Sequence, residues 1–172
     1  MLVRIANNWE QGMAISYEDI KRQRIKLEDK RQVRRTQLQK DIGNLMESYR
    51  ASLNFEYPQW FDKNDTPRPY VTLGLINANN LYEKTSIASL RLDKDNKISF
   101  FISTVVNDSP TSGDHYLVSV TVHYDSGVLI ASIGDEGHKI YVADPESEDG
   151  LSEVIEGIKQ LIITGLTDHS LD

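Results

Sequence analysis

The chain has 172 residues, of which 39% are hydrophobic and 26% charged, and a formal net charge of −7, which is the composition of a soluble globular protein. The absence of cysteine excludes thiol catalysis, zinc–thiolate sites and disulfide bonds. The N-terminus lacks the apolar run of a signal peptide, and no stretch reaches the roughly 18 apolar residues of a membrane span. We therefore expect a cytoplasmic protein with one domain, residues 1–172.

The first predicted element is a long helix over residues 16–54. Ser16 followed by Asp19 has the spacing of a capping box, and no proline intervenes before Pro58. A helix of this length extends roughly 58 Å, whereas a compact domain of this size has a radius of gyration of about 16 Å. We therefore expect the helix either to project in part or to break, with Gly43 as its weak point.

Residues 20–40 form a basic segment with nine basic and two acidic side chains, a local balance of +7. The rest of the chain holds ten basic and twenty-four acidic residues, a balance of −14. Such asymmetry indicates an interaction surface. Like charges also recur at four-residue spacing, and each such pair costs roughly 0.2 to 0.5 kcal/mol in an isolated helix. The basic residues are Lys21, Arg22, Arg24, Lys26, Lys30, Arg31, Arg34, Arg35 and Lys40.

An apolar stripe follows one side of the predicted helix but is interrupted in the middle. Arg31 occupies the stripe between Leu27 and Leu38, with Arg34 and Arg35 close beside it. We therefore expect an anchored second half, residues 38–53, and a more exposed first half. The stripe covers about 80° of arc and consists of Ile20, Leu27, Leu38, Ile42, Leu45, Tyr49 and Leu53.

An aromatic segment follows the helix: Phe55, Tyr57, Trp60 and Phe61 supply four of the fourteen aromatic residues. Large aromatic side chains mostly serve cores, so a hydrophobic plug that seats the helix on a sheet is one interpretation. The other is a contact surface for a partner. A polar, proline-marked loop continues to Pro69.

From Tyr70 onward the hydrophobic period changes toward two, which predicts strands. Short polar turns join several of them and favour antiparallel neighbours. Residues 151–166 then carry a second helical stripe. The pattern predicts an α+β domain with a long N-terminal helix, an antiparallel meander sheet of about six strands and a C-terminal helix, the helices mainly on one sheet face. The predicted strands are 70–77, 86–93, 97–106, 115–124, 128–133 and 138–143.

The sequence contains none of the common catalytic or nucleotide-binding motifs. His115 and His123 share a strand face but lie eight residues, roughly 27 Å, apart, too far for one metal ion. The groupings of His123 with Asp125 and of His138 with nearby carboxylates are read as solvated turns. No catalytic residue, metal site or cofactor is predicted.

Three interpretations of the basic segment remain open: a helix that is merely solvated, a protein-binding surface that includes self-association, and a phosphate-binding surface for nucleic acid. Its apolar residues do not share one face, which disfavours membrane binding. We favour a non-enzymatic protein-binding protein, with nucleic-acid association as the alternative and an unfamiliar enzyme on the polar sheet face third. The expected partner-binding residues are Arg24, Lys30, Arg31, Arg34, Arg35, Tyr57, Trp60 and Phe61.

Overall fold

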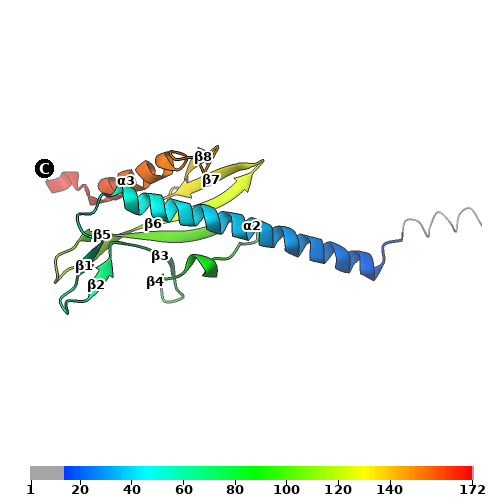
Figure 1. Cartoon of the computed structure of the whole chain (residues 1–172), viewed down its shortest axis with the longest axis horizontal. Helices are drawn as coiled ribbons and strands as arrows, with labels where there is room; N and C mark the ends of the chain where they lie inside the picture. Colours follow the sequence, from blue (N-terminus) through cyan, green and yellow to red (C-terminus); the bar gives the residue numbers. More distant parts are fainter. Residues whose placement is uncertain (1–13, 172) are drawn as a thin grey trace, which may run out of the picture. The chain divides into compact units, whose positions relative to one another are not determined.

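The computed structural model describes residues 14–171 and confirms the α+β class (Figure 1). By its internal contacts the chain divides into two units between Arg34 and Arg35. The helices and strands, in chain order, are α2 (Tyr17–Ser52), β1 (Gln59–Phe61), β2 (Pro67–Pro69), β3 (Val71–Ile76), β4 (Tyr82–Lys84), the 3-10 helix η1 (Ile87–Ser89), β5 (Ile98–Asn107), β6 (Asp114–Asp125), β7 (Val128–Ile133), β8 (His138–Val142), α3 (Ser152–Leu166) and the 3-10 helix η2 (His169–Leu171).

Helix α2 begins at the predicted capping box. The backbone N–H of Asp19 donates to the Ser16 hydroxyl at 3.2 Å, and the backbone N–H of Ser16 donates to the Asp19 carboxylate at 2.9 Å. These reciprocal bonds satisfy donors at the start of the helix. The helix continues without a break through Gly43 and ends at Ser52. Asn54 then adopts the left-handed conformation, with φ of 51°, that often terminates a helix.

The burial of α2 changes along its length. Every residue from Ala14 to Lys30 is exposed. The predicted contrast between an exposed first half and an anchored second half is therefore confirmed. From Leu38 onward one face enters the core, and its hydrophobic residues there are at most 2% exposed: Leu38, Ile42, Leu45, Met46 and Tyr49.

The main sheet has six antiparallel strands in the order β4-β3-β5-β6-β7-β8. From β5 to β8 each strand pairs with the next, as in a meander. The β6–β7 turn has positive φ at Ser126 and Gly127, the geometry of a tight two-residue hairpin. At the other end, β3 lies between β4 and β5, so the chain passes from the edge strand β4 across to β5.

The prediction of a strand over residues 86–93 is wrong. Ile87–Ser89 form the 3-10 helix η1, and the sixth strand is instead β4. A 3-10 helix has three residues per turn, so Ile87 and Leu90 lie on one side of it. Leu90 is 1% exposed and enters the core. Over so short a stretch, a three-residue spacing and the two-residue alternation of a strand are difficult to separate from sequence.

One face of the sheet carries the core. Val118, Val120 and Val122 of β6 are at most 3% exposed and cluster with the second half of α2 and with α3, as the predicted alternation requires. The hydroxyls of Tyr49 and Thr104 are 2.8 Å apart and join α2 to β5. The helices therefore cover one sheet face and leave the other for smaller and more polar side chains.

Candidate functional site

The basic segment is built on α2, whose capping box and helix-forming residues hold it helical. Arg24 pairs with Glu28 at 3.0 Å, with both side chains more than 60% exposed, so the pair contributes only about 0.3 to 0.5 kcal/mol. Lys30 is exposed. Arg31, Arg34 and Arg35 are half-exposed, and each already has an interaction partner.

Within residues 14–34, one face of the helix combines apolar and arginine side chains. We name Tyr17, Ile20, Arg24, Leu27, Arg31 and Arg34 the N-terminal seam. Their spacing alternates between three and four residues, and they fall within about 100° of arc. Tyr17 is 74% exposed, Ile20 59% and Leu27 51%. Such spacing is typical of a helix face that packs against another helix.

The predicted aromatic residues belong to a different element. A two-stranded hairpin, β1–β2, carries Trp60 and Phe61, and Tyr57 precedes it. Trp60 is half-buried and donates its indole N–H to the Pro69 carbonyl at 3.3 Å. Tyr57 and Phe61 are 63% and 51% exposed. These two rings, and not the half-buried indole, offer open contact area.

The structure does not bring the aromatic residues next to Arg35, the one predicted arginine of the second unit. Arg35 precedes Ser52 by seventeen residues of α2, about 25 Å at the rise of an α-helix. The aromatic residues follow Ser52, at the far end of that helical stretch. Arg35 and the aromatic residues therefore lie on separate surfaces of the second unit.

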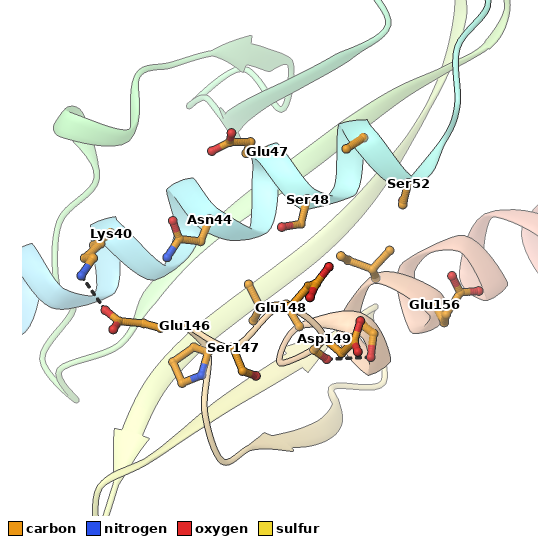
Figure 2. A pocket seen from close by; sticks show the side chains of 15 residues that line it. Lys40, Asn44, Glu47, Ser48, Ser52, Glu146, Ser147, Glu148, Asp149 and Glu156 are labelled. Atoms are coloured by element: carbon orange, nitrogen blue, oxygen red, sulfur yellow. Dashed lines mark hydrogen bonds and ion pairs between the residues drawn. The ribbon is translucent and has the colours of Figure 1, made fainter.

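A feature that sequence reasoning missed is a groove between the second half of α2 and the start of α3 (Figure 2). It encloses about 670 Å³. Figure 2 shows polar side chains of α2 on one side and side chains of residues 146–149 on the other. Ala51, Leu151 and Ile155 supply apolar surface to its lining. We name this the acidic groove, because its lining includes the carboxylates Glu47, Glu146, Glu148, Asp149 and Glu156.

The electrostatics of the acidic groove are one-sided. Lys40 is the one basic residue in its lining, so five carboxylates leave a local charge of −4. Lys40 pairs with Glu146 at 2.5 Å, and this hydrogen bond raises the pKa of the lysine. Glu156 pairs with Lys159 at 3.1 Å. The groove therefore favours a cationic ligand.

The sequence held one signal for this groove. Residues 144–149 contain four acidic residues, but their local pattern predicts only a turn before the second helix. Its carboxylates meet Glu47, about a hundred residues earlier, only because α3 packs beside α2. That packing is a tertiary property without a local sequence pattern.

His123 lies on β6, on the sheet face where the predicted polar residues gather. Its Nδ1 atom is buried without a hydrogen-bond partner. Burial, followed by the positive charge of Lys97, lowers the pKa of His123. Nearby, the hydroxyls of Ser99 and Thr121 bond each other at 2.8 Å.

Comparison with known proteins gives no assignment: no protein-family model, curated protein or solved structure matches the chain. Within residues 14–171, no group of three or more His, Asp or Glu side chains is placed to hold a metal ion. The same part of the chain contains no helix that is both long and apolar enough to cross a membrane.

Proposed function

We propose that this chain is a non-enzymatic protein-binding protein that presents the N-terminal seam of α2 to an acidic protein surface. The observation that carries the proposal is the exposure of Ile20 and Leu27 between arginines on one helix face. Exposed apolar residues at helical spacing provide contact area, and arginines provide bidentate contacts to carboxylates. The exposed rings of Tyr57 and Phe61 are a separate, secondary contact surface.

A protein partner explains the seam better than nucleic acid does. Phosphate contacts need only cations, so they would leave Ile20 and Leu27 without a role. The acidic remainder of the chain, with its balance of −14, would also repel a polyanion. A helix with apolar residues and carboxylates at the same spacing satisfies both kinds of seam residue.

The proposal is tested with a designed probe, a fluorescent helical peptide in which Leu and Glu alternate at three- and four-residue spacing. We expect saturable, salt-sensitive binding by fluorescence anisotropy. The variant Arg24→Glu, Arg31→Glu, Arg34→Glu should bind the peptide at least about tenfold more weakly, a loss of about 1.4 kcal/mol. Circular dichroism verifies that the variant remains helical.

A matched control reverses three cations of the same helix that lie off the seam: Lys21→Glu, Arg22→Glu and Lys26→Glu. The change in net charge is identical, so equal weakening by both variants would mean unspecific attraction and contradict the proposal. Mixed-sequence DNA and RNA are titrated in parallel. Saturable binding of nucleic acid without binding of the peptide would favour the alternative function, and turnover of a substrate would contradict the non-enzymatic part.

A further inference from the structure

We infer that a pocket formed by the segment after α2 and by residues next to β3 and β5 binds a quaternary ammonium group. The pocket encloses about 480 Å³, within the size range of small-molecule sites in proteins. It lies wholly within the second unit and shares no residue with the N-terminal seam, so the inference goes beyond the proposed function. We name it the aromatic pocket, because its lining includes three aromatic rings and two carboxylates: Phe55, Tyr57, Tyr70, Glu56 and Asp108.

The rings supply the apolar part of the pocket. Phe55 and Tyr70 stack with their ring centroids 4.2 Å apart and their planes 14° from parallel. Both rings are half-buried and pack against the hydrophobic core, so the pair is held in place before a ligand binds. Tyr57 lines the same pocket and is 63% exposed. A cation beside an aromatic face is attracted by the negative charge of the π electrons.

Two carboxylates give the aromatic pocket a formal charge of −2. They belong to Glu56 and Asp108, whereas every other residue of the lining is uncharged. The Tyr70 hydroxyl donates a hydrogen bond of 2.8 Å to Asp108. This bond raises the pKa of Tyr70, and the negative charge of Glu56 adds to the effect, so both carboxylates act on the same part of the pocket.

The chain itself does not neutralise these carboxylates. Among residues 14–171, the ion pairs leave Glu56 and Asp108 without a lysine or arginine partner. A cation that enters the aromatic pocket therefore displaces no basic side chain. Its charge would lie near two carboxylates while its apolar surface contacts the rings.

The combination of rings and carboxylates selects the kind of cation. A metal ion such as Ca²⁺ takes about six to eight oxygen ligands, and the described part of the chain has no group of three His, Asp or Glu side chains placed to hold one. A primary ammonium group is strongly hydrated and loses that water in an apolar lining. A quaternary ammonium group has no N–H to leave unsatisfied and presents methyl groups to the rings.

The first test is an NMR titration of the isotope-labelled chain with choline chloride. We expect saturable binding, with the changed amide signals clustered at residues 53–57, 70 and 105–108. The N-methyl signal of choline should move upfield, because an aromatic ring shields protons above its face. The uncharged isostere of choline, with a tert-butyl group in place of trimethylammonium, should bind at least about fivefold more weakly. Absence of choline binding, equal binding of the isostere, or signal changes centred elsewhere would each overturn the inference.

Two variants, each with a matched control, test the two parts of the aromatic pocket. Glu56→Gln removes a charge and keeps the shape of the side chain, and Glu153→Gln makes the same change at an exposed position of α3. Tyr57→Leu removes a ring of the lining, and Phe61→Leu removes an exposed ring outside it. Each pocket variant should weaken choline binding about three- to fivefold. A control that weakens binding as much as its pocket variant would overturn the inference, and thermal melts establish that all four variants are folded.

A second set of ligands distinguishes the source of the ammonium group. A short peptide with one trimethyl-lysine is compared with the same peptide carrying unmodified lysine and with free choline. Tighter binding of the methylated peptide than of choline would assign the pocket to a modified protein side chain, and equal binding would assign it to a small molecule. Unmodified peptide that binds as tightly as methylated peptide would overturn the selection for a quaternary group. The acidic helical peptide tests the seam alone, so failure of one proposal is distinguishable from failure of the other.

Discussion

At the scale of single residues, Asp41 is the buried charge of the α2 core face. It is 2% exposed and accepts a hydrogen bond of 2.6 Å from the Tyr124 hydroxyl and a longer one of 3.4 Å from Gln37. Burial raises the pKa of Asp41, and the bond from Tyr124 only partly opposes this. The folded chain therefore binds this proton more tightly than the unfolded chain does.

Protonation of Asp41 makes the free energy of unfolding depend on pH. Because the folded pKa of Asp41 lies above the unfolded value of 3.8, this group makes the chain more stable as pH falls from neutral toward that value. Asp41→Asn should lack this increase in stability at lower pH. Urea unfolding at about pH 7 and about pH 5 measures the change in the free energy of unfolding. A variant whose free energy of unfolding changes with pH as that of wild type does would contradict the role of Asp41.

The pH dependence of stability that His123 contributes has the opposite sign. Its folded pKa lies below the unfolded value of 6.5, so the stability that it contributes is complete above that value and is lost as pH falls through the folded pKa. We expect His123→Gln to lose less stability than wild type between about pH 7.5 and about pH 5.5. His138→Gln, at an exposed position, is the control, and an equal effect there would contradict the prediction.

At the scale of elements, α2 is one helix with two roles. Leu27 and Leu38 lie within about 20° of each other around its axis. Leu38 is 0% exposed, however, and Leu27 is 51% exposed. The same residue type at the same helical phase therefore serves the core in one place and the seam in the other.

Two leucine substitutions separate these roles. Leu38→Ala should reduce the free energy of unfolding by about 2 to 5 kcal/mol, because it leaves a cavity in a packed core. Leu27→Ala should change it by no more than about 0.5 kcal/mol, yet weaken binding of the acidic peptide. Chemical denaturation and anisotropy measure the two effects. A large loss of stability from Leu27→Ala would indicate that the seam is structural.

Several elements could be predicted from local patterns, and the failures have physical causes. The alternation of β6 and the spacing of Ser16 and Asp19 are local signals, and both predictions are confirmed. The β1–β2 hairpin was missed because prolines at both ends of β2 argue against a strand. The turn of the hairpin is held by the Asp62 carboxylate, which accepts hydrogen bonds from the backbone N–H groups of Asn64 and Thr66.

The candidate site was only half predictable. The arginines of the seam stand out in the sequence because they interrupt an apolar stripe on one helix. The groove depends on how α3 packs beside α2, so no spacing in the sequence relates Glu47 to Glu148. Sequence analysis thus revealed the cationic surface and missed the anionic one.

At the scale of the whole molecule, opposite charge gathers on different surfaces of one chain. Binding of the acidic peptide to the N-terminal seam should be strongly dependent on ionic strength, since the Debye length falls from about 10 Å at 0.1 M salt to about 3 Å at 1 M. We expect fluorescence anisotropy to show weaker binding of the peptide at the higher salt concentration. Stronger binding in high salt would instead indicate a mainly apolar contact.

The ends of the main sheet add a consequence for solubility. β4 has three residues and β8 five, and the two edge strands carry Lys84 and Lys139. Short edges with lysine disfavour the pairing of unsatisfied backbone groups with another chain, the contact that begins aggregation. Growth of fibrils from the edges of this sheet is therefore disfavoured by the same lysines that keep those edges in contact with water.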